Sequence, residues 1–133
     1  MSKEPARTRP ISLVMARQYL AKAEEFLASA RDDLAASRMT AATSLAVHAG
    51  ICASDAVAGT RLGKRSAGDG HNEALTLLRL SGEDGIELAR ILARLIALKP
   101  KAEYDPTDIP PATARQAVDW AHRCVNIARK VLS

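Results

Sequence analysis

The residues of this chain that could carry out chemistry gather in one loop, at positions 63–70, and at the histidine that follows it. Lys64 and Arg65 supply positive charge, and His71 opens the next predicted helix. Cleaving RNA without a metal ion needs a base for the ribose 2′-hydroxyl, an acid for the leaving oxygen and a cation for the charge that develops on phosphorus. Arg65 and His71 are therefore the candidate catalytic residues.

These two residues can converge only if the loop folds back on itself. On a continuous helix their side chains would differ by about 120°, but Gly68 and Gly70 make a helix through this segment costly. A histidine at a helix start feels the positive end of the helix dipole, which lowers its pKa and favours the neutral base. Two alternatives stay open: binding of RNA or a nucleotide without cleavage, and a loop of solvated charges with no chemical role.

A second polar pair lies in the helix predicted after a turn at residues 38–40. His48 and Asp55 stand seven positions apart among small residues, about 20° apart around the helix. They are either satisfied polar groups at a helix or subunit interface, or the border of a nucleic-acid groove. Cys52 and Cys124 lie in apolar helical segments without metal-ligand spacing, so we predict buried free thiols, a reducing cytoplasm, and neither metal nor cofactor.

The elements that must position these residues are predicted from apolar stripes at spacings of three and four. Ser12 is expected to cap the first helix, Ser81 to begin a capping box, and Asp108 to cap the last helix. No strand-like alternation is present. The predicted fold is all-α, an up-and-down antiparallel helical bundle of four long helices and one short helix, with the helices at about 12–37, 41–62, 71–80, 83–98 and 109–132.

The helix predicted at 83–98, which Lys99-Pro100-Lys101 is expected to end, is apolar almost all round. It should be the most central helix, or one of its faces should meet another subunit. Its narrow polar strip contains Glu87, Arg90 and Arg94. The two arginines are either a solvated edge paired with Glu87 or part of a nucleic-acid-binding set, which comprises Lys64, Arg65, Arg90, Arg94 and Lys101.

Composition fits one domain. The chain has 133 residues, 47% of them hydrophobic but only 3% aromatic, which favours closely packed helices and argues against recognition of RNA by base stacking. A net charge of +4 suits an anionic partner without requiring one. No apolar run approaches the ~18 residues of a membrane span, so we predict a cytoplasmic protein. Residues 1–11, rich in proline and basic side chains, are predicted to be a disordered arm, and 12–133 the bundle.

Three segments together resemble the HEPN family (higher eukaryote and prokaryote nucleotide-binding domain), in particular stand-alone actinobacterial members. They are YLAKAEEFLASARDDLAAS leading into TAATSLAVHAGICASDAV, the loop GKRSAGDGHNEAL, and AEYDP before the last helix. The resemblance spans residues 14–132. It implies an all-helical bundle that dimerises, and it adds Tyr104 and Asp105 to the groove of His48 and Asp55.

The resemblance also implies a function. Many members are toxins, or partners in toxin–antitoxin and defence systems, and often pair with a small nucleotidyltransferase. Catalytic members are metal-independent endoribonucleases with an Arg-x(4–6)-His motif, whose spacing Arg65 and His71 satisfy. Ser66 stands where active members often carry Asn, so both RNA cleavage and RNA or nucleotide binding without cleavage stay open. The alternative is a non-catalytic module that binds a cognate antitoxin or a nucleotidyltransferase.

Overall fold

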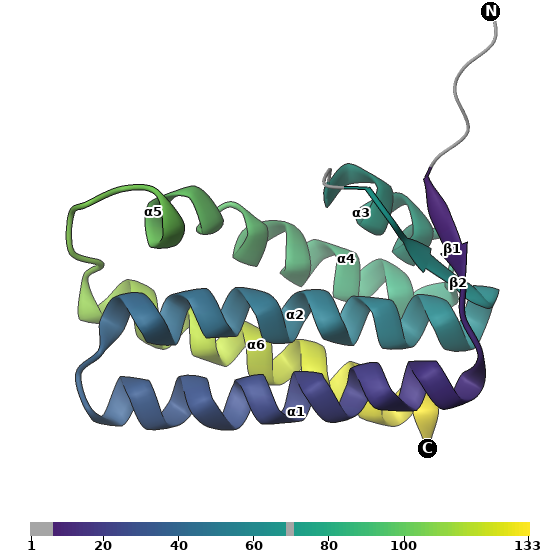
Figure 1. The fold of residues 1–133 in the computed structure, drawn as a ribbon, viewed down its shortest axis with the longest axis horizontal. Coiled ribbons are helices and arrows are strands. Elements are labelled where there is room, and N and C mark those ends of the chain that lie inside the picture. Colours follow the sequence, from purple (N-terminus) through teal and green to yellow (C-terminus); the bar gives the residue numbers. More distant parts are fainter. Residues whose placement is uncertain (1–6, 69–70) are drawn as a thin grey trace, which may run out of the picture.

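The computed structural model describes residues 7–68 and 71–133, which form a helical bundle with one small two-stranded sheet (Figure 1). The predicted all-α class is confirmed. The long helices α1, α2, α4 and α6 make up the body. In chain order the elements are β1 (Thr8–Pro10), α1 (Leu13–Ala35), α2 (Met39–Leu62), β2 (Lys64–Ser66), α3 (His71–Arg79), α4 (Gly82–Ile96), α5 (Lys99–Glu103) and α6 (Pro111–Leu132).

Helix α2 lies at the centre of the bundle, flanked by α1 and α4 with α6 behind it in Figure 1. Ala46, Ala49, Ala53 and Ala56 are fully buried, because short side chains let the neighbouring helices approach closely. The prediction that α4 is the most central helix is therefore wrong. Helix α2 is long and apolar enough to cross a membrane, but 61% of its most apolar window is buried within the bundle, as in the core helix of a globular domain.

The start of α1 and the end of α2 lie close to where the sequence predicts them. The Ser12 hydroxyl accepts a hydrogen bond from the Met15 N–H at 3.1 Å, which confirms the predicted cap of α1. Helix α2 ends at Gly63, whose φ of 68° is left-handed and therefore favours glycine. The chain then turns directly into β2.

Two predicted caps are wrong. The Ser81 hydroxyl donates to the Leu77 carbonyl at 2.7 Å instead of capping α4. Helix α6 begins after Pro110 and not at Asp108, because a proline with its fixed φ is well suited to a helix start.

The small sheet corrects the prediction that the chain has no strand and, for residues 7–11, the prediction of a disordered arm. Strands β1 and β2 are antiparallel, with Thr8 opposite Ser66 and Pro10 opposite Lys64. The Ile11 N–H donates to the Gly63 carbonyl at 2.9 Å, and the Ile11 side chain is buried. Strands of three residues are too short to show an alternating pattern. Residues 1–6 of the predicted arm lie outside the described residues.

Helix α5 is a further correction. Lys99-Pro100-Lys101 was expected to end a helix, but it begins a new one, because a proline is tolerated in the first helical turn. Ala102 of α5 packs against Ile109 and Ala114 at the start of the last helix. The described residues therefore contain six helices, one more than predicted, and the additional helix carries two residues of the candidate site.

Candidate functional site

The two predicted catalytic residues have different neighbours. The guanidinium carbon of Arg65, on β2, lies 5.6 Å from the ring centroid of Tyr19 on α1. Its Nη1 donates to the Ser66 carbonyl at 2.8 Å. His71, the first residue of α3, has its Nε2 3.3 Å from Nζ of Lys99 on α5. Within the described residues no hydrogen bond joins Arg65 to His71.

Burial and charge act in opposite directions on Asp55, on the Arg65 side of the loop. Burial raises the pKa of Asp55, on α2, to about 7, although the positive charge of Arg65 opposes the shift. No ion pair joins the two side chains in the part of the chain described here. Arg65 Nε is itself buried without a hydrogen-bond partner there. Arg65 is therefore held mainly by the Tyr19 ring and by its own strand.

On the other side, His71 is kept neutral. Burial lowers the pKa of its imidazole, the Lys99 ammonium lowers it further, and Glu103 acts in the opposite direction. An ammonium group donates hydrogen bonds and accepts none, so Nε2 of His71 must be the unprotonated ring nitrogen. The arrangement places a neutral base in contact with a positive charge.

Helix α5 connects this pair to α2. Glu103 lies one turn after Lys99, and its Oε1 is 3.5 Å from Nε2 of His48. The His48 ring in turn lies 5.7 Å, centroid to centroid, from the ring of Phe26. Sequence reasoning missed both Lys99 and Glu103. Their spacing of four would have indicated a shared helix face only if a helix had been predicted there.

The predicted groove of His48, Asp55, Tyr104 and Asp105 is not assembled by direct contacts. His48 is directed to α5, and Asp55 lies near β2. The Tyr104 side chain is 77% exposed in the connection between α5 and α6. Asp105 accepts hydrogen bonds from the hydroxyl and N–H of Thr107, which lower the pKa of its carboxyl. Its interactions are therefore those of a local turn.

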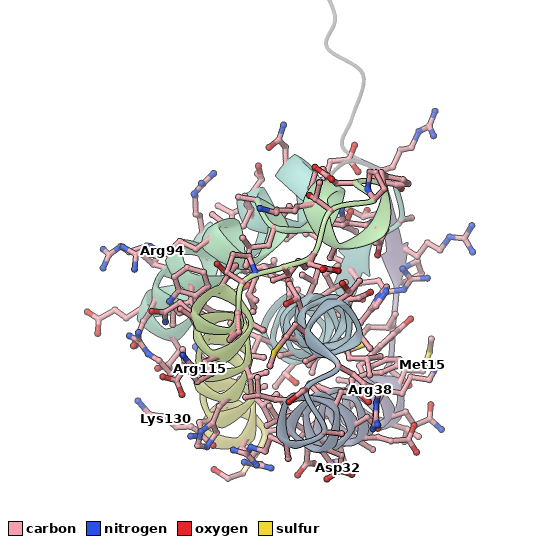
Figure 2. All side chains as sticks on the ribbon, turned by 90° about the vertical axis from the view of Figure 1, so that its left-hand side faces the viewer. Met15, Asp32, Arg38, Arg94, Arg115 and Lys130 are labelled. Atoms are coloured by element: carbon pink, nitrogen blue, oxygen red, sulfur yellow. The ribbon has the colours of Figure 1, made fainter. Side chains whose placement is uncertain are left out.

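The predicted nucleic-acid-binding set is divided between two sides of the molecule. Lys64 and Arg65 belong to β2, and Lys101 belongs to α5. Arg90 and Arg94 lie on α4, where they line a hollow together with a residue of α6. Figure 2 shows Arg94 projecting from one side of the molecule, whereas strand β1, which pairs with β2, lies on the other side. The five residues do not form one continuous surface.

Both cysteines are free, as predicted, but only Cys124 is buried as expected, and Cys52 is half-buried. Burial raises the pKa of the Cys52 thiol to about 11 and that of Cys124 to about 12, so both are protonated and unreactive near neutral pH. No group of three or more potential metal-ligating side chains occurs among residues 7–68 and 71–133.

No model of a known protein family matches this chain, and no curated protein matches it. The resemblance to HEPN proteins therefore stays a prediction from the three quoted segments.

Proposed function

We propose that this chain binds the phosphate groups of RNA or of a nucleotide at Lys99 and His71. The observation that carries the proposal is the 3.3 Å separation between Lys99 Nζ and His71 Nε2. A phosphate oxygen entering beside them would accept a hydrogen bond from the ammonium, as charged groups form the strongest such bonds. The Nε2 lone pair would then be released to act as an acceptor or a base.

In this proposal Lys99 takes the role of the cation that the sequence motif gives to Arg65. Arg65 already stacks on Tyr19 and donates to a backbone carbonyl. Withdrawing it would forfeit a cation–π contact of about 0.5–2 kcal/mol. Lys99 has only to give up its contact with the neutral imidazole of His71. The ammonium is therefore the more available of the two charges.

We place this binding in a HEPN-like protein of a bacterial toxin–antitoxin or defence system. The three resembling segments and the helical bundle support this placement. The small sheet of β1 and β2 weighs against this placement, since an all-helical family does not predict a sheet. A homodimer is part of the same proposal.

Metal-independent cleavage would extend this binding. His71 Nε2 would take the proton of the 2′-hydroxyl as its oxygen bonds to phosphorus, and Lys99 would stabilise the negative charge. The bond from phosphorus to the 5′-oxygen would break, and that oxygen would receive a proton from the Lys99 ammonium. The products would be a 2′,3′-cyclic phosphate and a free 5′-hydroxyl, which mass spectrometry distinguishes from other cleavage products.

Binding is tested by fluorescence anisotropy with a labelled single-stranded RNA over a range of salt concentrations. Lys99→Gln should weaken binding of all sequences alike and reduce the salt slope by about 1. Lys22→Gln on α1 makes the same charge change away from His71 and serves as the control. Equal losses in both variants, or affinity that does not vary with salt, would refute the proposal.

Cleavage is tested separately, in the presence of a chelator. His71→Asn keeps a neutral polar side chain, so it should retain RNA binding while abolishing cleavage and any slowing of growth on expression. A His71→Asn protein that cuts RNA as fast as the wild type would remove the enzymatic part and leave the binding part intact.

A second candidate function is a non-catalytic module that binds a partner such as a nucleotidyltransferase. Three consecutive apolar side chains at the start of α1 favour it: Leu13, Val14 and Met15 are 55%, 62% and 39% exposed. Val14→Asp should abolish a complex with a nucleotidyltransferase partner, measured with both proteins purified. A complex unaffected by Val14→Asp would exclude this surface.

A further inference from the structure

One face of α4 carries four charged residues in an ordered stripe, which we call the α4 charge stripe: Glu83, Glu87, Arg90 and Arg94. Their spacings of four, three and four keep them within about 60° of arc around the helix. All four are exposed, and none forms an ion pair within the described residues. The predicted pairing of Glu87 with the two arginines is therefore not formed. The stripe lines a hollow of about 550 Å³, together with Ile86, Ile91 and Arg123.

The charges of the stripe suit the helix dipole, but two of its three neighbouring pairs are of like charge. Acidic residues near the amino terminus and basic residues near the carboxyl terminus complement the helix dipole. However, Glu83 and Glu87 are like charges at a spacing of four, as are Arg90 and Arg94, and such pairs are destabilising. The dipole also gives no reason for Ile86 to stand 39% exposed between them. An external partner would account for both features.

The order of the stripe is self-complementary. Glu83 and Arg94 are equidistant from the point midway between residues 88 and 89, and so are Glu87 and Arg90. Ile86 is exposed close to this midpoint, whereas Ile91 is buried in the core. If a second copy of α4 lies antiparallel across that point, every glutamate of one stripe faces an arginine of the other, and the exposed Ile86 of each copy lies near the centre. This is the residue pairing that a two-fold interface requires.

We propose that the chain forms a homodimer through antiparallel packing of α4 against α4 of a second copy. RNA is a poorer fit, since two carboxylates occupy half of the stripe and would repel phosphates. An acidic peptide would meet the same two carboxylates. A second copy is the occupant that satisfies both halves at once. The interface rests on the homodimer of the proposed function, but it does not depend on RNA binding at Lys99 and His71, neither of which belongs to α4.

Charge reversal gives a direct test. Glu83→Arg with Glu87→Arg makes the stripe wholly positive, and Arg90→Glu with Arg94→Glu makes it wholly negative. Each variant alone should be monomeric, with the dimer Kd raised more than roughly 100-fold, because like charges would face each other. An equimolar mixture should form a 1:1 dimer, since all four facing pairs then have opposite charges. Analytical ultracentrifugation at low salt measures both.

Further measurements separate this interface from a structural or nucleic-acid role. Circular dichroism establishes that each variant is folded, and the variant with all four reversals should again form a homodimer. Arg31→Glu with Arg115→Glu, on exposed positions of α1 and α6, changes net charge as the negative variant does and should leave the dimer intact. A monomeric wild type, a dimer in either reversed variant alone, or a mixture without a complex would overturn the proposal. So would a monomeric wild type that loses RNA binding on reversal of Arg90 and Arg94.

Discussion

Replacing Asp55 by asparagine should stabilise this protein at alkaline pH. Burial raises the pKa of this carboxyl from 3.8 to about 7 in the folded chain, with Arg65 opposing the shift. A shift of roughly three units corresponds to about 4 kcal/mol at 1.36 kcal/mol per unit. The side chain is only half-buried and keeps some hydration, so we expect Asp55→Asn to raise the free energy of unfolding by about 2 kcal/mol at pH 8.

The sign follows from the proton balance. Between pH 4 and 7 the folded chain still holds the Asp55 proton, while the unfolded chain has released it. The stabilisation of the wild type by the protonated form is therefore complete below pH 4 and is lost as the pH rises through about 7. The depressed pKa of His71 acts oppositely, adding stability as the pH rises towards 6.5. The difference between wild type and Asp55→Asn cancels the His71 contribution.

Urea unfolding, followed by circular dichroism at pH 4 and at pH 8, measures this difference. The variant should exceed the wild type at pH 8 and nearly equal it at pH 4. Asp119→Asn, at an exposed position on α6, is the matched control and should show no such pH dependence. If Asp55→Asn instead lowers stability at pH 8, attraction to Arg65 outweighs desolvation, and our account of this cluster is wrong.

Three further substitutions test a helix cap and two glycine positions. Ser12→Ala should lower the free energy of unfolding by about 1 kcal/mol through loss of the α1 cap, and an unchanged urea midpoint would contradict the role of that hydrogen bond. Gly85→Ala should cost about 1–3 kcal/mol or more, because the added Cβ would collide with the Leu78 carbonyl oxygen. Gly63→Ala has free space but a left-handed φ, so it should cost only about 1 kcal/mol. A greater loss at Gly63 than at Gly85 would reverse this order and refute the packing argument.

The sequence predicts the long helices well because their stability arises from patterns that are local and repeated. The apolar stripe of α1 and its Ser12 cap fix one end of that helix closely. The central place of α2 was not predicted, although its row of alanines is visible in the sequence. Helix α4 is apolar almost all round by residue type, and such a pattern predicts a central position in the bundle. The central position instead belongs to α2, because its small side chains let the neighbouring helices approach closely.

The candidate site was predicted only in part because its partners are distant in the chain. His71 was identified from its place after a glycine-rich loop, but Lys99, its contact, lies 28 positions later. A lysine followed by proline is typical of a helix end, so the local sequence does not predict the helix that holds Lys99 and Glu103. The small sheet of β1 and β2 likewise pairs two segments that are separated by more than fifty residues. Local patterns contain no information on such pairings.

The spacing of a motif and the geometry of a site make different predictions here, and one comparison separates them. The small sheet and the Tyr19 ring hold Arg65 in place, while His71 contacts α5. Arg65 and His71 could therefore converge only if Arg65 left its strand position and its aromatic contact. An enzyme built on the motif would lose cleavage with Arg65→Gln and tolerate Lys99→Gln. An enzyme built on the contacts would show the reverse, because the ammonium already lies beside the base. Single-turnover cleavage rates of the two variants, which carry the same charge change, therefore decide whether Arg65 or Lys99 serves as the cation.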